Sequence, residues 1–141
     1  MKEIKPNLED IARTENKNWQ TPKVLNLLRL LLGGNDKFTE EPVYLIKNDG
    51  MFFGDKEYFV YDGNTLHFLA ESGMTTIKYK LIENNNDLEQ VREEMGEVYW
   101  PGPCIQSVMG YLRTRVWVLG QGDHQNSYER VVYEGETLSS N

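Results

Sequence analysis

Cysteine is nearly absent from this chain, because Cys104 is the only one among 141 residues. One cysteine cannot form an internal disulfide, and a zinc site built from several thiolates needs more of them. Chains without disulfides are typical of reducing compartments. We therefore expect a cytoplasmic protein whose packed core, rather than a covalent link, holds the fold.

Long apolar segments are also missing. The longest, Val24–Leu32, spans nine residues and is interrupted by Asn26 and Arg29, whereas a membrane-spanning helix needs about 20 apolar residues. The first twenty residues are mostly charged and polar and lack the apolar stretch of a secretory signal. We expect neither a transmembrane helix nor export by a signal peptide.

Basic residues are outnumbered by acidic ones, 15 against 22, which gives a net charge of −7. Binding to phosphate backbones needs clustered Lys and Arg, so we do not expect a nucleic acid partner. The charge is uneven, since residues 1–35 hold six basic and four acidic residues, whereas residues 36–141 hold nine and eighteen. A charged partner should therefore be basic and bind the acidic part, which has a net charge of −9.

Residue clusters that carry metal, phosphate or acid–base chemistry are missing too. The two histidines, His67 and His124, have no second ligand at a metal-binding spacing. No Gly-Lys-Ser or Gly-Lys-Thr phosphate loop occurs. The acidic pairs Glu40–Glu41 and Glu93–Glu94 are consecutive, so their side chains point apart. We expect no metal ion and no cofactor.

What the chain does have is enough apolar residues for a core, with 39% hydrophobic and 11% aromatic residues. The length predicts a single domain over residues 1–141. We expect an α+β fold that begins with a helical segment over residues 1–35. A sheet-rich body over residues 36–134 and a mobile tail over residues 135–141 follow.

Two helices should form an N-terminal helical hairpin. The first is expected over Asn7–Asn18, where apolar residues recur at helical spacing. The second has Thr21 as N-cap, Pro22 at its first position and Gly33 as its stop.

The sequence of the body, residues 36–134, predicts an antiparallel β-meander with one or two further helices packed on it. Asn48-Asp49-Gly50 and Asp62-Gly63-Asn64 are typical hairpin turns. Strands are expected at residues 43–47, 51–53, 58–61, 65–70, 75–82, 113–119 and 127–133, with a short one at residues 97–100.

A third helix should start at the amides of residues 84–86, with Asn86 as cap and Glu89 bonding back to it, and should end at Gly96. Residues 104–113 fit either a helix or a strand. Pro103 and the spacing of the apolar residues favour the helix.

Cys104 is the strongest catalytic candidate. At a helix N-terminus its thiol would have a lowered pKa and could act as a nucleophile. His124 or His67 would then be the base, oriented by Asp123 or Asn126. The alternative is that Cys104 is a small core residue, and no peptidase signature surrounds it.

Aromatic and arginine side chains gather in one region that is suited to binding a partner, because Trp, Tyr and Arg dominate interface hot spots. As a strand, residues 113–119 would place both arginines and the tryptophan on one face. The alternative is a core that uses aromatics as filler. The candidates are Tyr99, Trp100, Tyr111, Arg113, Arg115 and Trp117.

The helix over Val24–Leu32 is apolar around most of its circumference, which indicates burial against more than one partner. Leu27, Leu28 and Leu31 are therefore candidates for a homo-oligomer contact. Together these features favour a non-enzymatic interaction module, such as a small acidic regulator, an inhibitor or immunity-type protein, or an assembly subunit. The alternative is a small cysteine-dependent hydrolase or a small-ligand-binding domain that uses Cys104 and His124.

Overall fold

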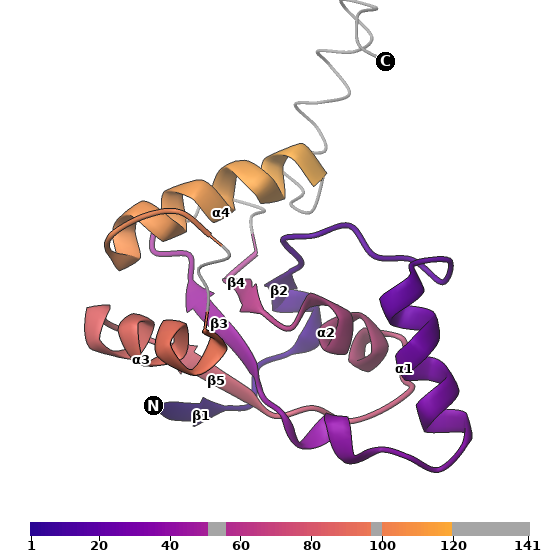
Figure 1. Ribbon diagram of the computed structural model, residues 1–141. Helices are drawn as coiled ribbons and strands as arrows, with labels where there is room; N and C mark the ends of the chain where they lie inside the picture. Colours follow the sequence, from indigo (N-terminus) through magenta and orange to yellow (C-terminus); the bar gives the residue numbers. More distant parts are fainter. Residues whose placement is uncertain (51–55, 97–99, 120–141) are drawn as a thin grey trace, which may run out of the picture.

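The fold is seen in a computed structural model that describes residues 1–50, 56–96 and 100–119 (Figure 1). Within them, a five-stranded sheet has the order β1-β5-β3-β4-β2. Its strands are β1 (Lys2–Ile4), β2 (Ile11–Ala12), β3 (Val43–Lys47), β4 (Tyr58–Asp62) and β5 (Tyr79–Ile82). The α-helices are α1 (Pro22–Leu32), α2 (Asn64–Glu71), α3 (Asn85–Met95) and α4 (Ile105–Leu119), and Leu8–Asp10 and Lys37–Glu40 form 3₁₀ turns.

The sheet is mixed, so the prediction of an antiparallel meander is wrong, although the α+β class is confirmed. β3 and β4 pair antiparallel, as do β1 and β5, but β5 runs parallel to β3 and β2 runs parallel to β4. The β3–β5 pair is parallel because the chain does not turn directly from β4 into another strand. It enters α2 instead, and this crossover returns β5 alongside β3.

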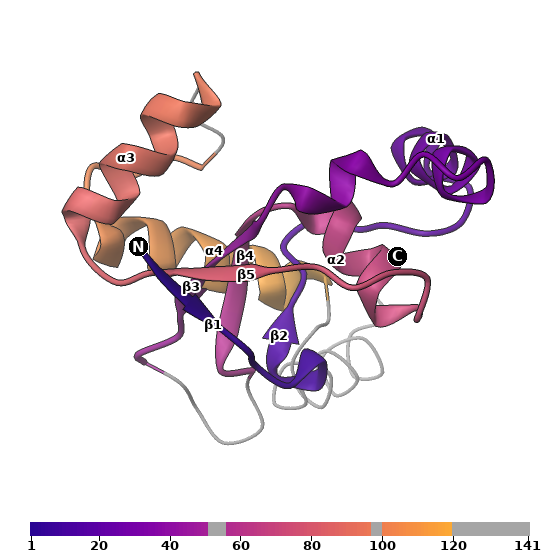
Figure 2. The ribbon, with the colours of Figure 1, turned by 90° about the horizontal axis from the view of Figure 1, so that it is seen from below.

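Both faces of the sheet are covered. Alternate residues of each central strand point to opposite faces, so Ile46 and Phe59 pack with α3 and α4, while Leu45 and Val60 pack with α2. Figure 2 shows α3 at the left, α1 and α2 at the right, and α4 running behind the central strands. This two-sided burial explains why β3 and β4 read as nearly continuous apolar runs rather than alternating ones.

The predicted N-terminal helical hairpin is wrong, because the chain begins with strand β1. The predicted helix over Asn7–Asn18 is replaced by a 3₁₀ turn and strand β2. Ile11 and Ala12 are both buried, one against each face of the sheet, and β2 pairs with β4. Pairing with a distant strand therefore overrode the local helical spacing.

The second predicted hairpin is also wrong. Residues 65–70 lie in α2 rather than in a strand, so His67 is a helix residue. Leu66, Leu69 and Ala70 are buried at helical spacing, a pattern that a segment this short shares with a strand. The turn Asp62-Gly63-Asn64 thus leads from a strand into a helix.

Helix α1 is confirmed, with Thr21 at the N-cap, Pro22 at its start and Gly33 at its end. Helix α3 is confirmed and ends at Gly96, but its N-cap is Asn84, two residues before the predicted cap. Asn84 Oδ1 accepts the Asp87 N–H at 2.9 Å.

The helical alternative for residues 104–113 is confirmed, but the strand predicted over residues 113–119 is wrong, because α4 continues to Leu119. Val108, Leu112 and Val116 are buried against the sheet at helical spacing. The strand predicted at 51–53 and all but Trp100 of the one at 97–100 lie outside the described residues. The strand at 127–133 and the tail lie outside them as well.

Candidate functional site

The site begins where β4 ends and α2 begins. Gly63 joins them with φ 106°, in the left-handed region. A Cβ there would lie 2.9 Å from Val43 Cγ2 and 3.2 Å from Val43 Cα. Only glycine fits this backbone and this approach to β3, so Gly63 sets the angle at which α2 leaves the sheet.

Asn64 ties this junction to the N-terminal segment. Its buried side-chain oxygen accepts the N–H groups of Thr14 at 2.8 Å and Glu15 at 3.3 Å, and its amide nitrogen donates to Thr14 Oγ1 at 3.0 Å. The Thr14 hydroxyl in turn donates to the Val60 carbonyl at 2.7 Å. These bonds hold Glu15 beside the start of α2.

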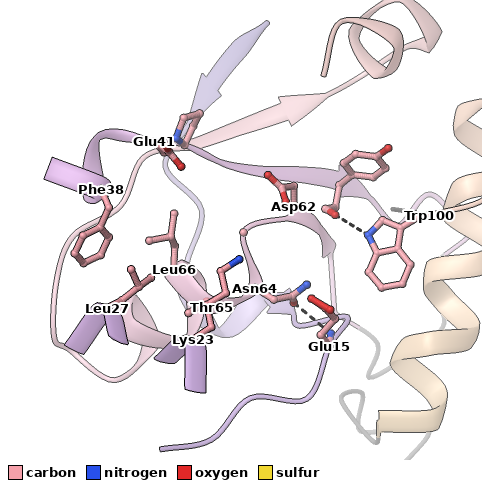
Figure 3. Close-up of a pocket in the computed structure, with 13 residues that line it drawn as sticks. Glu15, Lys23, Leu27, Phe38, Glu41, Asp62, Asn64, Thr65, Leu66 and Trp100 are labelled. Atoms are coloured by element: carbon pink, nitrogen blue, oxygen red, sulfur yellow. Dashed lines mark hydrogen bonds between the residues drawn. The ribbon is translucent and has the colours of Figure 1, made fainter. Parts of the chain in front are cut away.

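A pocket of about 200 Å³ opens at this junction (Figure 3). Its walls come from α1, the 38–42 segment, the β4–α2 junction and Trp100. One part is charged, with the carboxylates of Glu15, Glu41 and Asp62 and the ammonium of Lys23. The rest of the lining is Leu27, Phe38, Pro42, Tyr61, Gly63, Asn64, Thr65, Leu66 and Trp100.

The electrostatics of the pocket centre on Asp62. Burial raises the pKa of the Asp62 carboxyl above its usual range, and the charges of Glu41 and Glu15 raise it further. The Lys23 charge and the Gly63 N–H act in the opposite direction without reversing the shift. Ionised Asp62 is therefore incompletely compensated, and a cation beside it would be stabilised.

Hydrogen bonds hold the pocket wall that Trp100 forms. The indole Nε1 donates to the Tyr61 carbonyl at 2.6 Å. Arg92 of α3 donates to the Tyr61 hydroxyl at 3.2 Å and to the carbonyls of Trp100 at 3.2 Å and Gly102 at 2.6 Å. These bonds fasten the segment before α4 to β4 and α3.

The aromatic and arginine candidates are brought together only in part. The rings of Trp100 and Tyr111 lie 5.6 Å apart, and Arg115 Cζ lies 6.0 Å from the Trp100 ring centre. Trp100 is only 8% exposed, so much of it is core.

Arg113 points elsewhere, since it donates to Asn48 Oδ1 at 2.7 Å and to the Gly50 carbonyl. The prediction that Arg113, Arg115 and Trp117 share one face is wrong, because side chains two apart on a helix diverge. Trp117 is partly exposed, and Tyr99 lies outside the described residues.

Cys104 directly precedes α4, and its carbonyl accepts the Val108 N–H at 3.0 Å. Hydrogen bonds from the Ser107 side chain, then from the backbone of Ser107 and Gln106, lower the pKa of the thiol. Its Sγ lies 3.3 Å from Ser107 Oγ. Within the described ranges, the groups that act on the thiol do not include a histidine; His124, Asp123 and Asn126 lie outside these ranges.

His67 has no role beside Cys104, because its ring is fully buried between α2 and β5. Its Nδ1 lies 2.8 Å from the Tyr79 hydroxyl, and its Nε2 lies 3.5 Å from Glu71 Oε1. Burial, followed by the nearby Arg13 charge, lowers the pKa of His67 to about 4. Burial also raises the pKa of Tyr79, so both groups stay neutral near pH 7.

The leucines of α1 are less buried than the sequence predicted. Val24 is the one fully buried residue of this helix, and Leu27, Leu28 and Leu31 are half-buried. Leu30 is 41% exposed and Leu32 is 75% exposed. The helix thus packs one side on the protein, where it contacts α2, and leaves an apolar edge outside.

Sequence reasoning missed most of the pocket. Glu15, Lys23, Asp62, Asn64 and Thr65 were not singled out as site residues, and they come from three separate parts of the chain. The helical spacing after Gly63 was the one local signal, because it identifies a strand-to-helix junction where such side chains meet.

Comparison of the chain with protein families, with curated protein sequences and with solved structures finds no match. No helix in the described ranges is both long enough and apolar enough to cross a membrane. In the same ranges, no three His, Cys, Asp or Glu side chains are grouped so that they could hold a metal ion.

Proposed function

We propose that this protein is a non-enzymatic interaction module that binds a basic segment of a partner protein at the pocket between α1, α2 and β4. The observation that carries the proposal is the excess of negative charge there. Glu15 is paired with Lys17 at 3.9 Å, which leaves the carboxylates of Glu41 and Asp62 with the Lys23 ammonium in the pocket lining. Burial, with the charges of Glu41 and Glu15, raises the pKa of Asp62, and a cation beside this carboxyl group would favour its charged form.

The charge distribution of the whole chain supports the same partner. Residues 36–141 carry nine basic and eighteen acidic residues. Such a body attracts basic segments and raises their rate of association, in a manner that weakens with salt. A cytoplasmic location belongs to the proposal, since a single cysteine suits a reducing compartment.

The test uses a synthetic peptide of alternating lysine and serine, titrated into isotope-labelled protein and followed by amide NMR shifts. We expect shifts at Asp62, Gly63 and Thr65 that fade as salt is added. Asp62→Asn should weaken binding about fivefold, as for the loss of one partly screened charge pair of about 1 kcal/mol. Folding should not confound this result, because burial disfavours the charged carboxylate, and neutral asparagine relieves that cost.

Two variants control this experiment. Glu93→Gln removes the same charge from an exposed position on α3, and Cys104→Ala removes the thiol; neither should change the affinity. Equal weakening by Asp62→Asn and Glu93→Gln would overturn the pocket as the binding site. Loss of binding in Cys104→Ala would favour the alternative function, a hydrolase or ligand-binding domain that uses Cys104 and His124.

A homo-oligomer contact through α1 is a second proposal, supported by the exposed edge at Leu30 and Leu32. Leu32→Glu places a charge on this edge without entering the core. If α1 joins copies of the chain, sedimentation should show a smaller species with an unchanged circular dichroism spectrum. An unchanged sedimentation coefficient would exclude the contact.

A further inference from the structure

The pocket already contains one cation of the protein's own. Lys23, in the first turn of α1, has an exposed side chain that lines the pocket and reaches into it from the helix (Figure 3). Its charge lowers the pKa of Asp62, so the ammonium acts on this carboxylate. Yet in the described part of the chain Lys23 forms no ion pair, whereas Arg13 and Lys17 do.

The lining suits an aliphatic chain with a charged end. Leu27, Phe38 and Leu66 give an apolar wall, and the carboxylates of Asp62 and Glu41 provide negative charge. Long basic side chains pack their methylene stems on apolar surface while the charged end stays with polar groups. Lys23 itself has this form.

The Thr65 hydroxyl adds a polar group to the pocket wall. Thr65 is 3% exposed and lines the pocket, and its side chain makes no hydrogen bond in the described part of the chain. The Thr65 oxygen is not among the fully enclosed atoms of the described residues that lack a partner, so it is accessible from the pocket. An ammonium or guanidinium group in the pocket can donate a hydrogen bond to this oxygen.

We infer that the pocket accepts a single lysine or arginine side chain of the partner, and that Lys23 occupies this position in the free protein. This inference rests on the proposed function and names the chemistry of its ligand. Binding displaces the exposed Lys23 side chain towards solvent, which costs its charge interaction with Asp62 but no direct ion pair in the described part of the chain. The partner's cation then takes the place beside Asp62 and Thr65.

The variant Lys23→Met keeps the aliphatic stem and removes the charge. The probe is a Gly–Ser peptide with one central lysine, compared with the same peptide carrying norleucine. We expect Lys23→Met to bind the lysine peptide about three- to fivefold more tightly than the unaltered protein, in line with removal of one partly screened charge. Lys23→Arg, which keeps the charge and the stem, should not gain affinity, and the norleucine peptide should bind neither protein.

Arg29→Met is the matched control, because it removes a positive charge from an exposed position on the same helix, outside the pocket. Equal gains in affinity for the lysine peptide in Lys23→Met and Arg29→Met would show that the effect comes from the net charge of the protein. This result would overturn the inference. If the unaltered protein binds the lysine peptide through Asp62 but Lys23→Met gains nothing, this inference fails while the proposed function stands. If neither protein binds the peptide, the proposed function itself fails.

One competing role for Lys23 is to bind an anion together with the N–H groups at the start of α2. Titration with inorganic phosphate distinguishes the two roles. Shifts at Asn64 and Thr65 that disappear in Lys23→Met would overturn the inference. We expect no such shifts, because the Asp62 carboxylate already stands at the start of α2.

Discussion

Gly63→Ala should lower the free energy of unfolding by about 2–4 kcal/mol, because two costs add at this position. The first is conformational, since φ is 106°, where an L side chain is strained. The second is steric, because the new Cβ would lie 2.9 Å from Val43 Cγ2 and 3.2 Å from the Val43 backbone. Urea unfolding followed by circular dichroism measures the change.

Gly73→Ala separates the two costs. Gly73 has φ 76°, but a Cβ there would meet no atom within 4 Å. This variant should therefore lose only about 1–2 kcal/mol, the conformational part. Equal losses in the two variants would show that the approach of Gly63 to β3 contributes nothing, contrary to our expectation.

Acidification should destabilise the protein through His67. The pKa of this residue is about 4 in the folded state, against an ordinary value of 6.5. Above pH 6.5 the ring is neutral in both states, and its contribution to stability is complete. Between pH 6.5 and about 4 the His67 ring binds a proton in the unfolded state but not in the folded state. The free energy of unfolding therefore falls by about 3 kcal/mol over this range.

The physical reason lies in the surroundings of the ring. His67 is fully buried, its Nδ1 lies 2.8 Å from the Tyr79 hydroxyl, and Arg13 adds a positive charge nearby. Glu71, 3.5 Å from Nε2, is shared with Arg13, whose Nε lies 3.1 Å from the same carboxylate oxygen. The carboxylate therefore does not offset the cost of charging the ring.

The measurement is the free energy of unfolding across this pH range for the unaltered protein and for His67→Gln. Glutamine can still bond to Tyr79 but does not titrate, so the variant should be less dependent on pH. The difference between the two curves isolates His67 from Glu71 and Asp62, whose raised pKa values act in the opposite direction. Parallel curves would contradict the assignment.

Local signals were sufficient where an element depends on its own ends. Helix α1 begins at Pro22 and ends before Gly33. Gly96 ends α3 in the left-handed conformation that glycine favours. These helix-end signals act over a few residues, so the sequence alone is enough to predict them. The same holds for the turn at Asp62–Asn64, whose presence was predicted even though its consequence was not.

The errors occurred where distant contacts chose between two local possibilities. Residues 65–70 suit a strand or a helix, and packing of Leu66 and Ala70 against the sheet selects the helix. Val116 and Val118 alternate like a strand, but Val108, Leu112 and Val116 together form the buried side of α4. Ile11 and Ala12 pair with β4, nearly fifty residues away, which no local spacing could indicate.

The sequence by itself determined the α+β class, the limits of α1, the end of α3 and the acidity of the body, because composition and helix ends depend on residues close together in the chain. Only the tertiary structure decided the strand order, the directions of the strands and the pocket. Glu15, Lys23, Glu41, Asp62 and Trp100 meet there because Gly63 turns the chain into α2 and Asn64 holds the N-terminal segment against it. A site assembled from five distant parts of the chain has no local pattern, so the fold alone brings its charges together.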